Sequence, residues 1–93
     1  MLRVVAAPST RAALARLAPE QQAEVLSGLR QLPAAFGRPH AHAGLGVRQL
    51  RLGIFEARIG LTLRVLFERG GDLLVIKTLG GHDEIRRYLR ARA

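Results

Sequence analysis

Glycines divide the second half of the sequence into short segments, and this punctuation constrains the fold more than any other feature. They are Gly53, Gly60, Gly70, Gly71, Gly80 and Gly81. Apolar and polar side chains alternate between them, which predicts half-buried β-strands, and glycine permits the tight turns that connect such strands. We therefore predict four strands, at residues 47–52, 54–59, 63–68 and 72–78.

The first half of the sequence begins with a predicted strand and a predicted helix. Residues 2–7 form a β-branched run that Pro8 stops, which is typical of a short strand. Ser9 and Thr10 are residues that cap helices, and the alanine-rich segment after them predicts a helix that extends to Leu17.

A second helix is predicted to begin at Pro19 and to end before Pro33. Proline suits the first helical position, and the acid Glu20 lies in the first turn, where the helix dipole favours it. Four apolar residues fall on one face of this helix, namely Val25, Leu26, Leu29 and Leu32. We expect the two helices to form a hairpin with this stripe in the core, followed by an exposed connection over residues 33–46.

A final short helix is predicted over residues 84–91, with His82 or Asp83 as its cap. The complete order is strand, helix, helix, four strands, helix. This order predicts an α+β fold with a small, mainly antiparallel sheet, an N-terminal helical hairpin and a short C-terminal helix. A length of 93 residues predicts a single domain over residues 1–93.

The charge balance is the first indication of function. The chain has 15 Lys and Arg residues against 7 Asp and Glu residues, which gives a net charge of +8. All but one of the cations are arginine, whose planar guanidinium group suits phosphate better than the ammonium group of lysine. Such a surface is expected to attract a polyanion. An arginine-rich genome gives the same count, and that explanation stays open.

Composition also excludes several classes of protein. The chain has no cysteine, which rules out a disulfide framework, a cysteine-ligated zinc site and a thiol nucleophile. The apolar runs are far shorter than the roughly 20 residues that cross a bilayer, and the first residues lack a signal-peptide core. We therefore expect a cytoplasmic protein with no membrane partner.

The register of the predicted hairpins places three cations in one row. A three-residue loop at residues 60–62 puts Arg58 opposite Arg64, and a two-residue turn at residues 70–71 puts Arg64 opposite Lys77. Like charges directly opposite one another destabilise a sheet by a few tenths of a kcal/mol or more per pair. The stability of the fold therefore does not explain the row, whereas a bound anion does.

A plainer explanation is that the three side chains splay into solvent, with Glu56 and Glu68 beside them as partial neutralisers. The position of His82 in the sequence favours an anion site. Gly80 and Gly81 let the chain turn sharply beside the cationic face, and His82 follows directly after them. Histidine is the side chain that exchanges protons near pH 7.

Three segments in this part of the sequence resemble the RelE/ParE superfamily of bacterial type II toxin–antitoxin toxins. They are residues 53–60 (GIFEARIG), 63–67 (LRVLF) and 79–85 (LGGHDEI). The resemblance implies a RelE-like fold and a small toxin that a cognate antitoxin holds inactive. Members of the ribonuclease branch enter the ribosome and cut messenger RNA without a metal, through attack of the ribose 2′-hydroxyl on the adjacent phosphate.

The resemblance also implies roles for individual residues. Arg64 would hold the scissile phosphate with help from Arg58, and His82 would transfer protons; these three are the predicted catalytic residues. The predicted RNA-binding residues are Arg51, Lys77, Arg86 and Tyr88. The arginines of the final helix have three open interpretations: they bind RNA, they bind an acidic antitoxin segment, or they form only a solvated helix end.

Alternatives to the nuclease remain open. Glu56 stands where some ribonuclease members carry a basic residue, and Ile85 and Arg86 occupy positions where many members place an aromatic residue. The other major branch of the superfamily inhibits DNA gyrase by binding and has no nuclease centre. A relative that binds antitoxin or nucleic acid without activity is the third possibility.

His40 and His42 have the spacing that places two imidazoles on one side of an extended chain, as in a two-ligand metal site. No carboxylate or cysteine lies near them in the sequence, so contact with RNA and a solvated loop pair are the other interpretations. We expect no cofactor.

Overall fold

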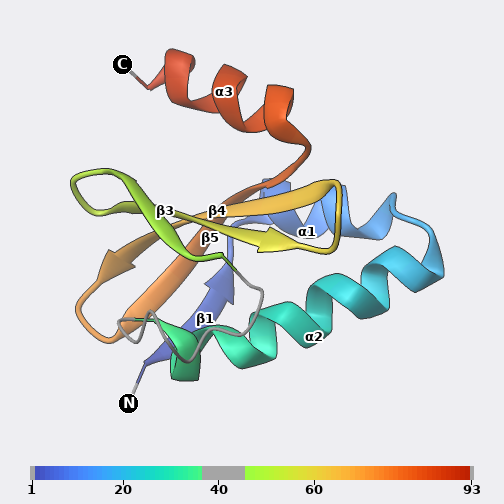
Figure 1. Ribbon diagram of the computed structural model, residues 1–93, viewed down its shortest axis with the longest axis horizontal. Coiled ribbons are helices and arrows are strands. Elements are labelled where there is room, and N and C mark those ends of the chain that lie inside the picture. Colours follow the sequence, from blue (N-terminus) through green and yellow to red (C-terminus); the bar gives the residue numbers. More distant parts are fainter. Residues whose placement is uncertain (1, 37–45, 93) are drawn as a thin grey trace.

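The computed structural model describes residues 2–36 and 46–92. Its elements, in chain order, are β1 (Arg3–Ala6), α1 (Pro8–Ala15), α2 (Pro19–Ala35), β2 (Arg48–Arg51), β3 (Ile54–Ile59), β4 (Leu63–Gly70), β5 (Leu73–Gly80) and α3 (His82–Ala91) (Figure 1). The predicted α+β fold, with two helices in the first half and one at the end, is confirmed. Most of the predicted connection over residues 33–46 lies outside the described residues.

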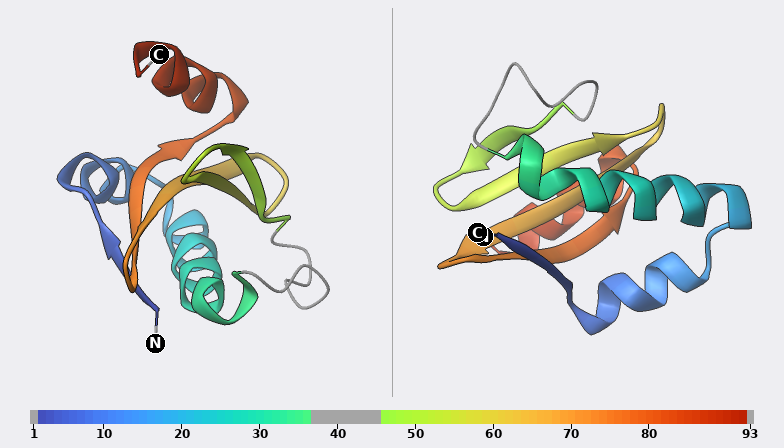
Figure 2. Two further views of the ribbon diagram at one scale, coloured as in Figure 1. Left: turned by 90° about the vertical axis from the view of Figure 1, so that its left-hand side faces the viewer. Right: turned by 90° about the horizontal axis from the view of Figure 1, so that it is seen from below.

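The five strands form one sheet with the order β1-β5-β4-β3-β2. β1 runs parallel to β5, and all other neighbours are antiparallel, so the sheet is mainly antiparallel as predicted. α2 contacts β1 and β3, α1 contacts β5, and α3 contacts β4 and β5. Figure 2 shows α3 on the side of the sheet away from α2.

The main core lies between the sheet and the first two helices. Val65 and Phe67 of β4 are fully buried there, together with Val25 and Leu32 of α2. Successive side chains of a strand point to opposite faces, so Leu66, which is also fully buried, lies on the face that α3 covers. That second face carries the polar groups described below.

The register of β3 with β4 follows the prediction. Ile59 pairs with Leu63, Ala57 with Val65, and Arg58 lies directly opposite Arg64. The loop between the two strands is the three residues 60–62, and Gly60 has a positive φ of 65°. The alternation of apolar and polar residues was sufficient here because no irregularity interrupts either strand.

The predicted register of β4 with β5 is wrong. The turn is formed by Gly71 and Asp72, so that Gly70 pairs with Leu73, and Arg64 lies opposite Gly80 instead of Lys77. A bulge at Lys77 shifts the pairing within the hairpin. Its physical reason is burial, because the bulge brings Leu79 into the same core as Ile76, three residues earlier in the strand.

The helix ends also differ from the prediction in detail. Pro33 lies inside α2, where the buried side chains of Leu32 and Ala35 keep the last turn packed on the core. Ser9 and Thr10 do not cap α1, which begins at Pro8. The Thr10 hydroxyl instead donates a hydrogen bond of 2.9 Å to the carbonyl oxygen of Ile76, next to the bulge.

α3 begins at His82, with Gly81 as its cap, two residues earlier than predicted. Over residues 2–36 and 46–92, no helix is both long and apolar enough to cross a membrane.

Candidate functional site

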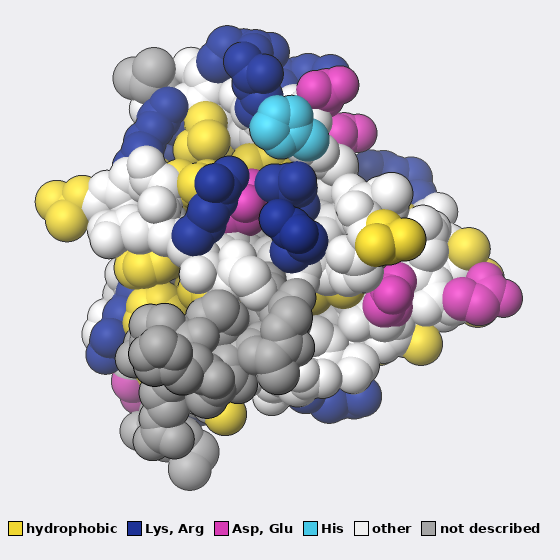
Figure 3. All heavy atoms as spheres, in the orientation of Figure 1, with side chains coloured by type: hydrophobic (Ala, Val, Ile, Leu, Met, Phe, Trp, Pro, Cys, Tyr) yellow, Lys and Arg dark blue, Asp and Glu magenta, His cyan; other side chains and the backbone are white. Residues whose placement is uncertain are grey.

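Strands β2, β3 and β4 gather three arginines around one glutamate on the face of the sheet that α3 covers in part. The register places Arg48 of β2 opposite Glu56 of β3, and Arg58 of β3 opposite Arg64 of β4. We call these four residues the arginine cluster. Figure 3 shows dark-blue cationic side chains on both sides of a magenta carboxylate in the middle of this face.

Glu56 is the centre of the arginine cluster. The residue is only 4% exposed, and its Oε1 atom accepts hydrogen bonds from Arg48 Nε at 3.1 Å and from Arg64 Nη1 at 3.3 Å. A buried carboxylate is costly unless it is paired, and hydrogen bonds between ionised groups are about twice as strong as neutral ones. The two hydrogen-bonded guanidinium groups therefore offset the cost of burying the Glu56 side chain.

The cluster keeps an excess of positive charge. Three arginines share one carboxylate, and Arg58 has no carboxylate partner among the ion pairs of the described residues. Its side chain is exposed and lies directly opposite Arg64, in an arrangement that destabilises a sheet. Guanidinium groups in this arrangement match the oxygen atoms of a phosphate, to which they donate paired hydrogen bonds.

His82 lies beside the arginine cluster. Gly80, at the end of β5, is paired with Arg64, and His82 follows two residues later as the exposed first residue of α3. It is the single histidine of the described residues, and Figure 3 shows a cyan imidazole next to dark-blue cationic side chains. The structure thus brings together the three predicted catalytic residues, Arg58, Arg64 and His82.

A glycine allows this close approach of α3 to the sheet. A Cβ atom added at Gly80 would lie 2.7 Å from the Cβ atom of Glu84 in the first turn of α3. Such a distance is too short for two carbon atoms that are not bonded, so any larger residue at position 80 would push the helix away. Gly80 therefore fixes where α3, and with it His82, sits relative to Arg64.

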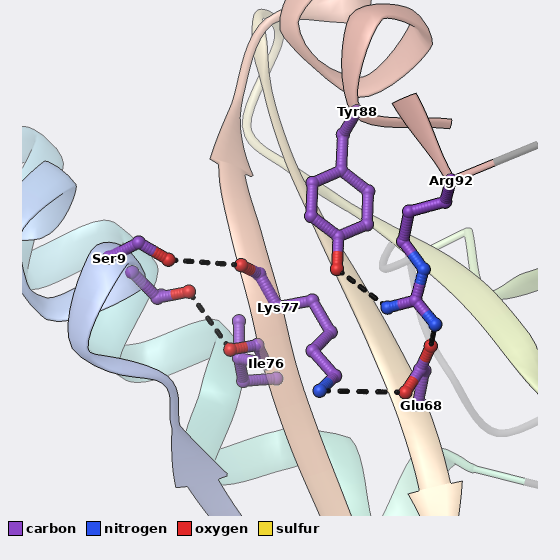
Figure 4. Close-up of polar contacts among 7 residues, drawn as sticks. Ser9, Glu68, Ile76, Lys77, Tyr88 and Arg92 are labelled. Atoms are coloured by element: carbon purple, nitrogen blue, oxygen red, sulfur yellow. Dashed lines mark hydrogen bonds and ion pairs between the residues drawn. The ribbon is translucent and has the colours of Figure 1, made fainter. Parts of the chain in front are cut away.

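Lys77 and Tyr88 lie in a different group of residues. Glu68 of β4 forms ion pairs with Lys77 Nζ at 3.6 Å and with Arg92 Nη2 at 2.9 Å. Arg92 Nη1 also donates a hydrogen bond of 2.9 Å to the Tyr88 hydroxyl. Figure 4 shows how these side chains meet between α3 and the sheet. We call Glu68, Lys77, Tyr88 and Arg92 the Glu68 network.

The Glu68 network places a cation at the C-terminal end of α3, where the helix dipole favours positive charge. The hydrogen bond to the Tyr88 hydroxyl is the largest cause that raises the pKa of Arg92, and electrostatic interactions with Tyr88 and with Glu68 raise it further. Because of the bulge in β5, Lys77 pairs with Glu68 and does not join Arg58 and Arg64 in the predicted row.

The remaining predicted residues are scattered. Arg51 is exposed at the end of β2, paired with Ile54, and Arg86 is exposed on α3. His40 and His42 lie outside the described residues. In the ranges 2–36 and 46–92, no group of three or more His, Cys, Asp or Glu side chains is arranged to hold a metal ion.

Arg48 and the central position of Glu56 were missed by the sequence prediction. The pairing of β2 with β3 contains an irregularity between Gln49 and Arg51, so the alternation of side chains does not run through the whole hairpin. The available signal was the Glu56-Ala57-Arg58 spacing, which places an acid and a base on the same face of one strand.

Solved structures of toxin–antitoxin complexes resemble this chain along most of its length. A chain of the RelBE2 complex from Mycobacterium tuberculosis is 26% identical with a TM-score of 0.60, and the match covers 87% of this chain and 98% of that chain. A chain of the RelE–RelB complex from Pyrococcus horikoshii is 21% identical with a TM-score of 0.68, covering 86% and 93%. A chain of the DinJ–YafQ complex from Escherichia coli is 11% identical with a TM-score of 0.62, covering 90% and 96%.

No family model matches the sequence, and no curated protein matches it either. The solved structures nevertheless agree in fold with the expectation from the motifs. The chain has a RelE-like fold, and the predicted resemblance to the RelE/ParE superfamily of toxins is confirmed. This likeness supports a toxin role for the chain.

Proposed function

We propose that the protein is the toxin of a type II toxin–antitoxin system and that it inhibits translation by cutting messenger RNA on the ribosome. The observation that carries this proposal is the excess of positive charge at Arg58 and Arg64, next to the imidazole of His82. A cationic cluster beside a group that exchanges protons is what metal-independent RNA cleavage requires. The similarity to chains of toxin–antitoxin complexes supports the same conclusion.

The proposed reaction uses only side chains of the cluster and of α3. Arg64 and Arg58 hold the scissile phosphate and stabilise the negative charge that grows on its oxygen atoms. The ribose 2′-oxygen loses its proton and forms a bond to phosphorus, while the bond from phosphorus to the 5′-oxygen breaks and that oxygen gains a proton. His82 serves these proton transfers. The products are a 2′,3′-cyclic phosphate and a free 5′-hydroxyl.

We propose two kinds of partner for this protein. One is the ribosome with its bound messenger RNA, for which the exposed Arg51 and Arg86 offer further positive charge. The other is a cognate antitoxin, because RelB and DinJ occupy that place in the complexes that contain similar chains.

Translation of a defined transcript in a cell-free system tests the proposal. The wild type is expected to cut the transcript, and Arg64→Ala and His82→Gln are expected to lose most of this activity. Arg30→Ala is the matched control, because it removes one exposed arginine from α2, on the far side of the sheet. Treatment of the purified protein with EDTA, which is removed before the protein is added to the translation mixture, is expected to leave cleavage unchanged. Loss of cleavage after this treatment would point to a metal ion in the protein, with His40 and His42 as the first residues to substitute.

Two outcomes would overturn the nuclease. Intact transcript together with inhibition of purified DNA gyrase would assign the protein to the gyrase-inhibiting class. Intact transcript without any growth inhibition after induction would make it an inactive binding relative.

A further inference from the structure

We propose that Glu56 is a positioning residue that holds the guanidinium groups of Arg48 and Arg64 as a two-armed clamp for RNA phosphate, and that Arg48 itself binds phosphate. The inference rests on the proposed function. It adds to the site Arg48 of β2, a residue that lies outside the three motifs that resemble the superfamily.

The geometry of the ion pairs supports a clamp. Both guanidinium groups donate to the same carboxylate oxygen, Glu56 Oε1, through Arg48 Nε and Arg64 Nη1. A guanidinium group has five N–H donors, so each arginine keeps most of its donors for a ligand. Because Arg48 uses its Nε atom, both of its terminal nitrogen atoms remain free of the contact to Glu56.

The exposure of the three side chains increases outwards from Glu56. The Glu56 side chain is 5% exposed, that of Arg64 is 22% exposed, and that of Arg48 is 62% exposed. The carboxylate therefore forms the floor, and the two guanidinium groups rise from it to the surface. Side chains that are held in place before RNA arrives lose less conformational entropy when they bind it.

A carboxylate at the floor of a phosphate site has an electrostatic cost. Its negative charge repels the phosphate that the arginines attract, so charge alone argues against an acid in this position. Positioning explains its presence, because one oxygen atom fixes two long side chains from strands on either side of β3. The two explanations of Glu56, positioning and mere neutralisation of the arginines, make opposite predictions for Arg48.

A double-mutant cycle on RNA binding separates them. Fluorescence anisotropy with a labelled single-stranded RNA oligonucleotide measures the affinity of the wild type, Arg48→Ala, Glu56→Ala and the double variant. With positioning, Arg48→Ala reduces the affinity about fivefold in the wild type but less than about twofold in the Glu56→Ala background. With neutralisation alone, the loss is equal or larger in the Glu56→Ala background, because Arg48 is then no longer paired.

The dependence of RNA affinity on salt tests the phosphate contact of Arg48. RNA affinity decreases as salt concentration rises, and the slope of this decrease in a log–log plot measures the number of phosphate contacts. In Arg48→Ala this slope is expected to become shallower by about 0.7, the amount for one lost contact to a single strand. Arg30→Ala, on the far side of the sheet, is expected to keep the wild-type slope. An unchanged slope in Arg48→Ala would overturn the contact.

Thermal melts show whether each variant folds. If Glu56→Ala unfolds, the cycle is repeated with Glu56→Gln, which keeps an oxygen acceptor without the charge and is expected to retain part of the coupling. An Arg48→Ala effect that does not shrink in either background overturns the positioning role, and so does a wild type that binds no RNA. The cycle measures RNA binding and not cleavage. A wild type that binds RNA without cutting it therefore overturns the proposed nuclease, and the cycle still decides whether Glu56 positions Arg48.

Discussion

Two carboxylates on the same face of the sheet organise cations in different ways. Glu56, in the middle of β3, is almost fully buried and receives Arg48 and Arg64 from the two neighbouring strands. Glu68, in the second half of β4, is 25% exposed and receives Lys77 from β5 and Arg92 from α3. Arg64 and Glu68 are four residues apart in β4, which corresponds to about 13 Å along a strand.

The arginine cluster and the Glu68 network differ in how much of their positive charge is paired with a carboxylate. In the arginine cluster, a third cation, Arg58, has no acidic partner among the described residues, and the arginine side chains reach solvent. In the Glu68 network both cations are paired with the carboxylate, and one of them ties α3 to the sheet. The same residue types therefore leave unpaired positive charge in one place and anchor a helix in the other.

Loss of Arg64 is expected to have the largest effect. Arg64→Ala should reduce cleavage of a translated transcript by about 100-fold or more, because one donor to a developing oxyanion is worth about 2.7 to 4 kcal/mol. The fold should persist, since the arginine side chain is not part of the main core. Cleavage assays and thermal melts of the same preparation check both statements. A variant that unfolds instead would make Arg64 a structural residue and remove the contrast with the Glu68 network.

Gly80→Ala should disturb both groups of residues together. The added Cβ atom would lie 2.7 Å from the Cβ atom of Glu84, and relief of this overlap requires α3 to move. We expect a loss of about 1 to 3 kcal/mol in the free energy of unfolding, as for other overpacked sites. Chemical denaturation measures this loss, and cleavage should fall with it because His82 begins α3.

Gly70→Ala is the matched control for that experiment. Gly70 has no positive φ, and a Cβ atom added there meets no atom within 4 Å. The same change of residue should therefore leave stability and cleavage close to wild type. If Gly70→Ala and Gly80→Ala lose equal amounts of stability and cleavage, the close contact of α3 with β5 at Gly80 contributes to neither.

Parts of this arrangement follow directly from the sequence. The alternation in β3 and β4 places Arg58 opposite Arg64, because a short glycine loop and a continuous apolar face allow only one register. The register of β5 does not follow in this way. The bulge at Lys77 exists because the core takes both Ile76 and Leu79, and that demand arises from packing against other elements.

The same distinction applies to the candidate site. The positions of Arg64 and His82 could be predicted from local pattern, because Arg64 lies near the start of β4, directly after a short loop, and His82 directly follows Gly80 and Gly81. Arg48 was missed because the pairing of β2 is irregular, and Lys77 was misplaced because its position depends on the bulge. The ion pairs of Glu56 with two other strands are tertiary contacts that no local pattern shows.

Equivalent substitutions of the two carboxylates measure their contrast directly. Glu56→Gln should lower the free energy of unfolding by about 1 to 3 kcal/mol, since it removes a buried charge that two arginines pair. Glu68→Gln should lower it by only about 0.5 to 1 kcal/mol, because partly exposed ion pairs are screened by solvent. Urea denaturation at low and high salt checks this order. If Glu68→Gln proves the more damaging, the anchor is the more important of the two for stability.

Lys77→Ala is expected to have the smallest effect. This variant tests whether Lys77 acts with the Glu68 network or with the arginine cluster. Its ammonium group is 3.6 Å from Glu68 and lies outside the arginine cluster, so cleavage should change less than about twofold and stability by less than about 0.5 kcal/mol. The salt dependence of RNA binding should also stay at the wild-type slope, in contrast to Arg48→Ala. A clear fall in that slope would mean that Lys77 leaves Glu68 when RNA binds. The bulge in β5 would then supply a mobile cation to the site instead of a fixed contact of the anchor.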